Sequence, residues 1–471
     1  MPGITAYSSY VPRARLARRK IAEAWGSSPS AGDIAVANYD EDALTLAVEA
    51  ALGCLGDEVA PDGLFFASTS SPYAEKQVAS VVATVCDLPR SAQTADFAGS
   101  ARAGVAALTA AANAVRAGAR RDVVVAAADC RTAAPESEIE GLLGDAAAAV
   151  RVGADNVLAE IVDAAWVAEE FTHLWRTDDQ RFVQSFAGKF SNTYGYARDI
   201  ADAVRDLLDR NGLGVQDVAW FATAAPDTRA AVDLCRRLGF DATTQLVPPP
   251  VGAIGSAGCA DPLLALGAAL DRAAAGDRIV VAGYGEGAEA VLLQATAALP
   301  LRRAAVAWDA WVAAGTPLAS YATYLRRRRI VPVEVAGEAI NNVLEHQELK
   351  QDVRLYGSRC RDCGQVQYPV ARVCIGCGAR DRLVDHRLAK RGTVFTFTID
   401  HLIANPELPL PMAVVDLDGG GRLFLQVTDF EADEVGIGCP VVLTWRRLHE
   451  GGGNRNYYWK ARPVRGAGGG A

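Results

Sequence analysis

The chain has 471 residues, half of them hydrophobic, and a formal net charge of −9 at pH 7. This length predicts two or three domains, and the acidic balance argues against a nucleic-acid binder or a binder of anionic membranes. No apolar run reaches the roughly 18 residues that a membrane span needs. No signal peptide opens the chain, so we expect a cytoplasmic protein without membrane or nucleic-acid partners.

The first part of the chain predicts α/β units. An amphipathic helix at about 41–55 precedes an apolar strand at 63–70 that ends in small polar residues. An Ala-rich helix then starts near residue 106, stops at Gly118 and leads into a β-branched strand that ends near residue 128. Glycine supports the stop because it adopts the left-handed conformation after a helix at little cost.

The next part repeats this order at an offset of about 158 residues. A helix at about 197–211 precedes a strand at 218–225, and an Ala-rich helix from residue 264 stops at Gly276 before a strand that ends near residue 283. Shared composition alone could make Ala-rich helices look alike, but here the stops and the strands also match in order. The repeat predicts a duplicated α/β domain with a pseudo-twofold axis and closely packed central helices.

Residues 301–345 are expected to form a closing arm. This arm contains four consecutive arginines at 326–329. Such a run could attract a phosphate-bearing ligand such as coenzyme A, or it could be a solvated helix end, which is the more common outcome.

A cluster of cysteines follows the arm. Two Cys-x-x-Cys pairs stand ten residues apart, and Gly364 and Gly378 follow them. Four thiolates suit a tetrahedral zinc ion and leave no coordination position open, so we predict a structural zinc site. The predicted ligands are Cys360, Cys363, Cys374 and Cys377. The other six of the ten cysteines are scattered, which in a reducing compartment indicates free thiols.

The end of the chain predicts a small all-β barrel. Short strands with alternating apolar residues, separated by Gly-rich turns, suggest an OB-fold. A loop is expected at 451–453 and a frayed tail at 466–470. The predicted strands lie near residues 392–399, 412–417, 422–427 and 440–445.

Dispersed segments of the chain match a known family. They are residues 3–12, 70–74 (Ser-Ser-Pro-Tyr-Ala), 95–96 with 102–104, 188–190 (Gly-Lys-Phe), 254–255 with 263–264, and 321–325 (Tyr-Ala-Thr-Tyr-Leu). Through these segments residues 1–330 resemble the thiolase superfamily, most closely the archaeal-type hydroxymethylglutaryl-CoA synthases. Residues 346–463 resemble the zinc-ribbon/OB-fold domain that in that family is often a separate partner protein.

The resemblance implies an α/β fold: a duplicated, five-layer αβαβα thiolase-like domain, followed by a zinc ribbon and an OB-fold barrel. It implies an acyl-CoA or acyl-carrier substrate, with coenzyme A or phosphopantetheine as the thioester group, and a homodimer formed through the thiolase-like domain. The expected domains are thiolase-like halves at 1–165 and 166–330, a linker helix with the zinc ribbon at 331–390, and the barrel with a flexible tail at 391–471.

The functional groups that the resemblance implies are all replaced. A Claisen-type synthase needs a thiolate, a carboxylate base, and a His with an Asn that polarise thioester carbonyls. The matching positions hold Ala101 for the cysteine, Thr69 for the glutamate, Ala224 for the histidine and Ser256 for the asparagine. Of five histidines only His173 precedes residue 345, in an amphipathic segment where a packed or surface histidine is the usual outcome.

Three residues are candidates for catalysis. Cys259, 158 residues after Ala101, starts the second central helix, where the helix N-terminus favours a thiolate; it is either a relocated nucleophile or a small packed cysteine. Tyr284 stands in a Gly-rich loop that borders the reaction centre in this superfamily, and it is either an acid or base or a packing residue. Ser256 could place its hydroxyl on a thioester oxygen.

Thr69, Ser100, Ala101 and Ala224 are expected to line the pocket. Thr69 could donate its hydroxyl to a thioester oxygen. Ser100 should not replace the missing thiol, because neighbouring residues on a helix point about 100° apart. Its expected role is to cap the helix that follows.

These residues favour an enzyme that makes or breaks a carbon–carbon bond of a thioester by an aldol or retro-aldol reaction, or that transfers an acyl group, without an acyl-cysteine. One alternative is a catalytically inactive scaffold or thioester-binding subunit. Another is a Claisen-type acyltransferase with a relocated nucleophile.

Overall fold

The structure is a computed structural model that describes residues 1–28, 30–56, 60–332, 342–403, 409–431, 433–451 and 453–465. It divides into two compact units: Met1–Ala37 with Asp42–Arg328, and Asn38–Glu41 with the described residues from Arg329 onward. Part of the expected closing arm, at 333–341, and the expected tail at 466–470 lie outside the described residues. None of the described helices has the length and apolar character to cross a membrane.

The first unit is organised by one nine-stranded sheet. Its strands are β1 (Gly3–Tyr10), β4 (Gly63–Ala67), β5 (Gln93–Phe97), β6 (Asp122–Cys130), β7 (Asp145–Gly153), β8 (Ala159–Ala168), β11 (Trp220–Thr223), β12 (Arg278–Tyr284) and β13 (Gly287–Ala295). Their order is β11-β12-β13-β8-β1-β7-β6-β4-β5. The two halves of the sheet join where β1 and β8 pair at Gly3↔Glu160 and Ile4↔Ala159. Counted outward from this junction, β1, β7, β6 and β4 correspond to β8, β13, β12 and β11, and β5 is an additional edge strand.

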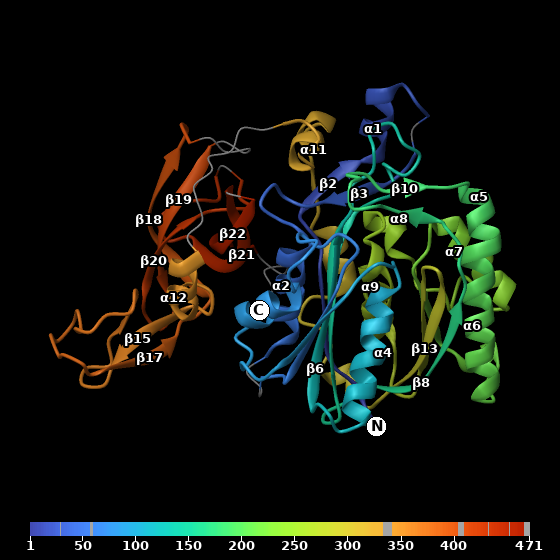
Figure 1. The fold of residues 1–471 in the computed structure, drawn as a ribbon, viewed down its shortest axis with the longest axis horizontal. Coiled ribbons are helices and arrows are strands. Elements are labelled where there is room, and N and C mark those ends of the chain that lie inside the picture. The colour runs from blue at the N-terminus through green and yellow to red at the C-terminus, as the bar shows by residue number, and fades with distance from the viewer. Residues whose placement is uncertain are drawn as a thin grey trace. The chain divides into compact units, whose positions relative to one another are not determined.

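Helices form three layers around the two halves of the sheet (Figure 1). The central helices α4 (Ala103–Arg116) and α9 (Asp261–Arg272) contact both halves. On the outer faces, α2 (Ala43–Cys54) packs on β6 and β7, and α6 (Ala197–Arg210) packs on β8 and β13. This is the predicted duplicated αβαβα arrangement, so the fold class is confirmed.

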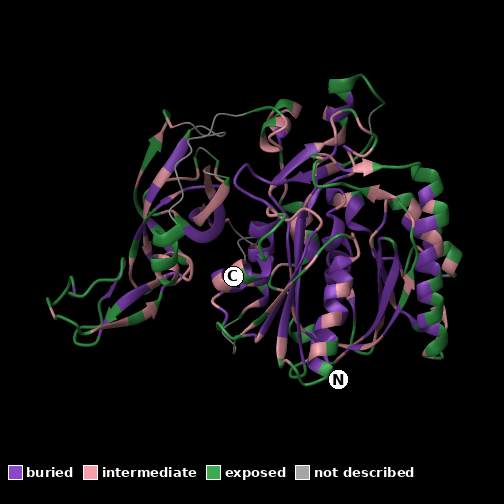
Figure 2. Ribbon diagram, in the orientation of Figure 1, coloured by how far each residue is buried: buried purple, intermediate pink, exposed green. Residues whose placement is uncertain are grey.

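Small residues allow the two central helices to approach closely. A side chain at Gly104 in α4 would place its Cβ 2.2 Å from the carbonyl oxygen of Cys259. The central helices and strands are largely buried, whereas α6 has one exposed face (Figure 2). The predicted helix stops are also present, because Gly118 and Gly276 have φ angles of 67° and 91°.

Shorter elements complete the first unit. They are β2 (Ala14–Ala17), α1 (Arg18–Trp25), β3 (Asp33–Val36), α3 (Val78–Val85), β9 (Leu174–Trp175), β10 (Gln184–Ser185), α5 (Gly188–Ser191), the π-helix η1 (Asn192–Tyr196), η2 (Val215–Asp217), α7 (Thr228–Leu238), α8 (Pro250–Ile254), η3 (Gly258–Ala260), η4 (Leu299–Leu301), α10 (Trp308–Ala313), β14 (Thr316–Pro317) and α11 (Tyr321–Arg327).

The arginine run that follows Leu325 is not a solvated helix end throughout. The guanidinium of Arg328 donates to Asp145 Oδ1 at 2.8 Å, and the two side chains are 5% and 0% exposed. The solvated interpretation is wrong for Arg328, because the carboxylate at the start of β7 holds the side chain inside the unit.

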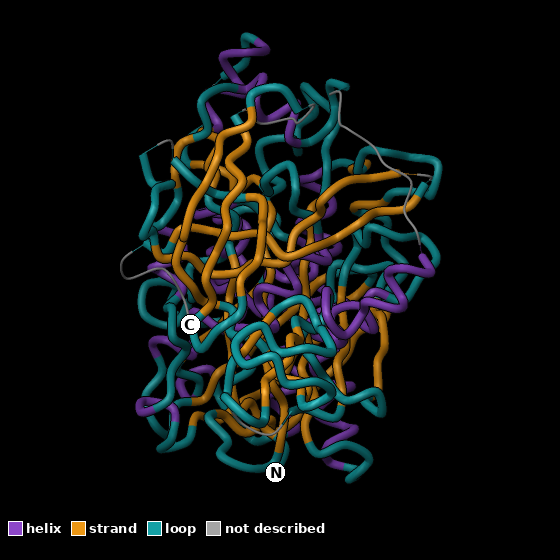
Figure 3. The backbone as a smooth tube through the Cα atoms, turned by 90° about the vertical axis from the view of Figure 1, so that its left-hand side faces the viewer, coloured by secondary structure: helices purple, strands orange, loops and turns teal. Residues whose placement is uncertain are grey.

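The second unit contains two small sheets. α12 (Asn342–Asp352) leads into a three-stranded sheet of β15 (Tyr356–Cys360), β16 (Val366–Gln367) and β17 (Leu383–Arg387). The five-stranded sheet has the order β20-β19-β18-β21-β22, and its strands appear as orange tubes in Figure 3. They are β18 (Arg391–Asp400), β19 (Leu410–Leu417), β20 (Arg422–Gln426), β21 (Pro440–Gly451) and β22 (Asn454–Pro463).

The structure has one strand in this sheet, β22, that the sequence did not predict. It pairs with β21 along its length, and a bridge between Val427 and Ala461 brings it against the end of β20. Buried residues such as Trp445 and Trp459 fill the interior of this sheet. The closure by β22 gives the barrel character that the other four strands alone could not provide.

Candidate functional site

A cavity of about 130 Å³ lies in the first unit, where strand ends and the starts of the central helices meet. All four positions at which the family's functional groups are replaced line this cavity, together with two further predicted residues. The predicted residues in the lining are Thr69, Ser100, Ala101, Ala224, Ser256 and Tyr284. The structure therefore brings together every residue predicted for the pocket except Cys259.

Cys259 lies in η3 behind the cavity and is fully buried. Its thiol donates to the carbonyl oxygen of Ala67 at 3.1 Å. Burial, and next the nearby charge of Asp129, raise the pKa of the thiol well above its usual value. This geometry favours the packing role of Cys259 over that of a nucleophile.

The vacant cysteine position lies against the turn between β12 and β13. Arg102 occupies the N-cap position of α4, and Ser100 stands two residues before it. The Ser100 hydroxyl accepts from the Arg102 amide at 3.4 Å, so the predicted capping contact is present but long. The same hydroxyl donates to the carbonyl oxygen of Gly285 at 3.2 Å. A Cβ at Gly285 would lie 2.4 Å from Ser100 Oγ, so this close approach requires glycine.

Asp129, in β6, fixes the segment that carries Thr69. Its buried carboxylate accepts hydrogen bonds from the backbone amides of Thr69 at 2.8 Å and Cys259 at 2.9 Å. It also accepts from the hydroxyls of Ser68, Thr69 and Ser70 at 3.0, 2.9 and 2.8 Å. Because its hydrogen is already donated to Asp129, the Thr69 hydroxyl does not donate to a ligand in this arrangement.

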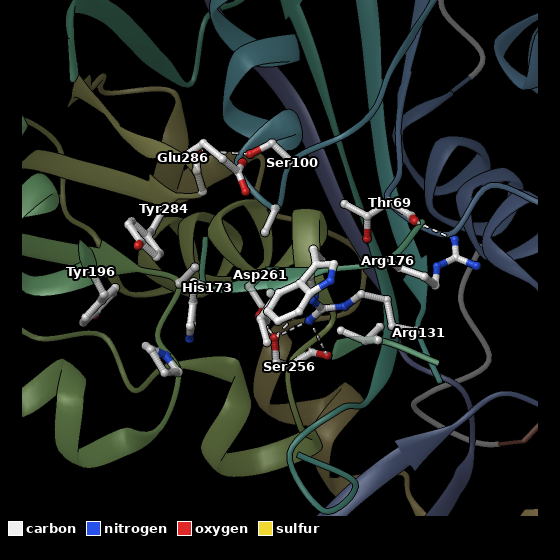
Figure 4. Close-up of a pocket in the computed structure, with 18 of the residues that line it drawn as sticks. Thr69, Ser100, Arg131, His173, Arg176, Tyr196, Ser256, Asp261, Tyr284 and Glu286 are labelled. Carbon is white, nitrogen blue, oxygen red and sulfur yellow. Dashed lines mark hydrogen bonds between the residues drawn. The ribbon is translucent and has the colours of Figure 1, made fainter. Parts of the chain in front are cut away.

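A cation, a hydroxyl and a carboxyl group form a chain in the lining (Figure 4). Arg131, which follows β6, donates from Nη2 to Ser256 Oγ at 2.8 Å, and Ser256 Oγ donates to Asp261 Oδ2 at 2.6 Å. Asp261 is the first residue of α9. Burial raises its pKa to about 6, against the hydrogen bonds from Ser256 and Ala257 and the charge of Arg131, which lower it.

Aromatic side chains form another wall of the cavity, with Tyr284, His173 and Tyr196 close together in Figure 4. The ring centroid of Tyr284 lies 5.8 Å from that of His173 and 5.8 Å from that of Tyr196. Tyr284 is 7% exposed, and its hydroxyl has no hydrogen-bond partner among the described residues. The hydroxyl itself lies against Gly195, where an added Cβ would be 2.1 Å from it, while the rest of the side chain lines the cavity.

The protonation states of these groups follow from their surroundings. Burial, and next the charge of Arg131, lower the pKa of His173 to about 4, so the imidazole is neutral at pH 7 and is a weaker base than an exposed histidine. Burial, followed by the charges of Asp199 and Glu286, raises the pKa of Tyr284 above its usual value. The phenol therefore stays protonated and can donate.

A second cavity of about 760 Å³ adjoins the first. The two cavities share His173, Tyr196 and Ser256 in their linings, among other residues. Charged side chains of both signs line the second cavity. The cationic ones are Lys189, Arg229 and Arg237, and the acidic ones are Glu138, Asp227 and Asp233.

The second unit contains the predicted cysteine cluster. The sulfur atoms of Cys360, Cys363, Cys374 and Cys377 all lie within 4.8 Å of one another. The Cys360–Cys377 and Cys363–Cys374 sulfur distances are 3.7 and 3.5 Å. Tetrahedral zinc with bonds of about 2.3 Å separates its sulfur ligands by about 3.8 Å, so the four thiols fit this ion.

The sequence did not single out any of the four charged residues in the first cavity, which are Arg131, Arg176, Asp261 and Glu286. Arg131 directly follows a strand end and Asp261 starts a helix, and these positions were the available signals. His173 is packed against the ring of Tyr284, in agreement with the expectation from the sequence, and it also lines both cavities.

Comparisons with known proteins divide the chain into the same two parts. Residues 348–382 match the family described as "ChsH2, rubredoxin-like zinc ribbon domain", and residues 385–446 match "ChsH2, C-terminal OB-fold domain". The predicted zinc ribbon and OB-fold are therefore confirmed.

The larger part is similar to named enzymes. A hydroxymethylglutaryl-CoA synthase of Methanopyrus kandleri is 30% identical over 297 residues, which cover 61% of this chain and 85% of the relative. The solved structure "MvaS in complex with 3-hydroxy-3-methylglutaryl coenzyme A" matches with a TM-score of 0.61 and 22% identity, over 72% of this chain and 94% of the other. The 3-oxoacyl-(acyl carrier protein) synthase III of Pseudomonas aeruginosa matches with a TM-score of 0.57 and 19% identity, over 63% and 98% of the two chains.

Proposed function

Because the chain belongs to the family of the hydroxymethylglutaryl-CoA synthases, we propose that it binds an acyl-CoA thioester and makes or breaks a carbon–carbon bond by an aldol or retro-aldol reaction. One observation carries this proposal. The lining at the vacant position presents Ala101 and no cysteine, yet it contains the proton-transfer groups of His173, Asp261 and Tyr284. An aldol reaction needs proton transfer and enolate stabilisation, but no covalent acyl-enzyme.

The second cavity supports binding of coenzyme A. Its volume of about 760 Å³ exceeds that of the first cavity, and Lys189, Arg229 and Arg237 can pair with phosphate groups. The two relatives named above as a hydroxymethylglutaryl-CoA synthase and as a complex with a coenzyme A thioester are consistent with this assignment. The thioester then reaches the first cavity through the shared wall at His173, Tyr196 and Ser256.

In the retro-aldol direction the substrate is a 3-hydroxyacyl-CoA thioester. The neutral imidazole of His173 takes the proton of the 3-hydroxyl group, and the Tyr284 phenol donates a hydrogen bond to the same oxygen as it becomes a carbonyl oxygen. The bond between carbons 2 and 3 breaks, and its electron pair forms the thioester enolate. Arg131, whose side chain lines the cavity, stabilises the enolate oxygen with its positive charge. A proton then returns to carbon 2.

The zinc ribbon has a separate role in this proposal. Cys360, Cys363, Cys374 and Cys377 hold a zinc ion that stabilises the small sheet of the second unit and leaves no position open for substrate. The ion therefore takes part in folding and not in the reaction.

The test is a panel of 3-hydroxyacyl-CoA thioesters with short, long and branched substituents at carbon 3. Mass spectrometry measures the shortened acyl-CoA and the released carbonyl compound. Tyr284→Phe and His173→Gln should each lower kcat at least about 100-fold, the usual contribution of a positioned acid or base. Tyr324→Phe is the control, because Tyr324 is also buried in the first unit but does not line the cavity.

Three results would contradict the reaction. Unchanged turnover in Tyr284→Phe and His173→Gln would show that neither Tyr284 nor His173 takes part in the reaction. A stable acyl group on Cys259 would establish a Claisen-type acyltransferase instead. If the protein bound the thioesters tightly but turned over none of them, it would be a non-catalytic thioester-binding subunit.

A further inference from the structure

The hydroxyl of Ser256 is saturated with hydrogen bonds in the structure. Its oxygen accepts from Arg131 Nη2 at 2.8 Å and from the Gly258 amide at 3.4 Å, and its hydrogen is donated to Asp261 Oδ2 at 2.6 Å. A hydroxyl group has one hydrogen and two lone pairs. While Asp261 is ionised, Ser256 therefore has no hydrogen left for a ligand.

A proton on Asp261 reverses this arrangement. Asp261 Oδ1 accepts from the Ala257 amide at 2.8 Å, so the proton resides on Oδ2, which faces Ser256. Ser256 Oγ then accepts from Asp261 and, having only two lone pairs, gives up one of its two present donors. The contact from the Gly258 amide is the longer of the two, 3.4 Å against 2.8 Å from Arg131, so it is the one lost. The Ser256 hydrogen turns to that side, toward the cavity that both Ser256 and Gly258 line.

We propose that Ser256 and Asp261 form a proton relay between the cavity and the interior, which exchanges one proton with carbon 2 of the thioester; this rests on the proposed function. In the retro-aldol direction Ser256 gives its proton to carbon 2 of the enolate, and Asp261 gives its proton to Ser256. The products are the acyl-CoA and the Asp261 carboxylate. In the aldol direction the carboxylate takes a proton from carbon 2 through Ser256.

The proton count closes over one turnover. In the retro-aldol direction the 3-hydroxyl proton moves to His173, and the proton of Asp261 moves to carbon 2. The His173 imidazolium then releases its proton to solvent, and the Asp261 carboxylate takes one from solvent, which restores both groups. No oxidant, reductant or metal is required.

The surroundings of Asp261 set the pH range of the relay. Asp129 lies in β6 and Arg131 directly follows it, Cys259 comes from η3, and His173 also lines the cavity. Burial is the largest influence and raises the Asp261 pKa to about 6, so the group is ionised above this pH and protonated below it. Proton abstraction from carbon 2 should therefore become faster as the pH rises through about 6.

The experiment measures exchange of the carbon-2 hydrogens of propionyl-CoA for deuterium in D₂O, by mass spectrometry, from pH 4.5 to 8. The native protein should show exchange that rises through about pH 6. Asp261→Asn and Ser256→Ala should lower the plateau rate at least about 100-fold, and Asp261→Asn should remove the inflection. Ser256→Thr, which keeps a hydroxyl, should restore much of the exchange.

The control is Glu289→Gln. Glu289 is also buried, accepts from the hydroxyl of Thr109 at 2.6 Å and has a pKa raised by burial, but it does not line the cavity. Its exchange profile should match that of the native protein. Calorimetric titration with propionyl-CoA checks that each variant still binds the thioester.

The relay and the proposed function fail in different ways. Exchange that keeps its rate and its inflection in Asp261→Asn and Ser256→Ala overturns the relay, whether or not 3-hydroxyacyl-CoA thioesters are cleaved. Relay-dependent exchange without cleavage of any thioester in the panel supports the relay and contradicts the carbon–carbon bond step. The absence of both exchange and cleavage in the native protein overturns both.

Discussion

Asp129→Asn should destabilise the local structure around Thr69 and Cys259, and the hydrogen bonds of Asp129 give the expected size of this loss. Each carboxylate oxygen of Asp129 accepts from one backbone amide, Oδ1 from Thr69 and Oδ2 from Cys259. In either orientation of the Asn side chain, its NH₂ group faces one of these amides. A hydroxyl donor could reverse its hydrogen bond, but a backbone N–H cannot.

An unpaired buried donor costs about 1–3 kcal/mol, and the remaining bonds lose the benefit of a charged acceptor. We therefore expect Asp129→Asn to weaken the local structure by about 2–4 kcal/mol, which corresponds to a decrease in protection of about 30- to 700-fold. Hydrogen exchange of the peptides that contain Thr69 and Cys259 measures this directly.

The control is again Glu289→Gln, which changes a buried carboxyl group whose partners in the structure include the hydroxyl of Thr109. Its effect on the Thr69 and Cys259 peptides should be small. Unchanged protection of these peptides in a folded Asp129→Asn protein would refute the reasoning that Asp129 holds this part of the site together.

Three other changes test separate parts of the structure. Gly195→Ala should lower turnover while thioester binding persists, because the new Cβ would lie 2.1 Å from the Tyr284 hydroxyl; normal turnover would contradict this. Asp145→Asn should destabilise the first unit by about 3–5 kcal/mol in urea unfolding, since it leaves the buried charge of Arg328 unpaired; a loss below about 1 kcal/mol would argue against that pair. Removal of metal with a chelator should unfold the sheet around Cys360 and Cys374, as seen by hydrogen exchange, and leave the first unit unchanged; protection that survives metal removal would contradict a structural zinc ion.

The duplicated fold could be predicted because it depends on patterns that repeat along the chain. The stops at Gly118 and Gly276 and the apolar strands reflect local conformational preferences, which a sequence displays directly. β22 was missed because its residues follow a Gly-rich turn and alternate less clearly than those of the other strands. The predicted homodimer and the predicted domain boundaries stay predictions.

The candidate site could be predicted only in part. The resemblance located the positions of Thr69, Ala101, Ala224 and Ser256, and the structure places all of them in one cavity. It could not locate Arg131 and Asp261, because they become neighbours only through the packing of β6 against η3, the turn that directly precedes α9. The burial of Cys259 is likewise a three-dimensional property, since its thiol is directed to Ala67, 192 residues earlier in the chain.

The central helix pair also has a consequence for how the chain is made on the ribosome. Strand β1 finds its partner β7 once residue 153 has been synthesised, so the first half of the sheet can assemble early. Helix α4, however, also packs against α9 and β13, which come more than a hundred residues later. Until these elements have been synthesised, the Ala-rich face of α4 is exposed to solvent. The nascent first half is then an aggregation-prone intermediate of the type that chaperones bind.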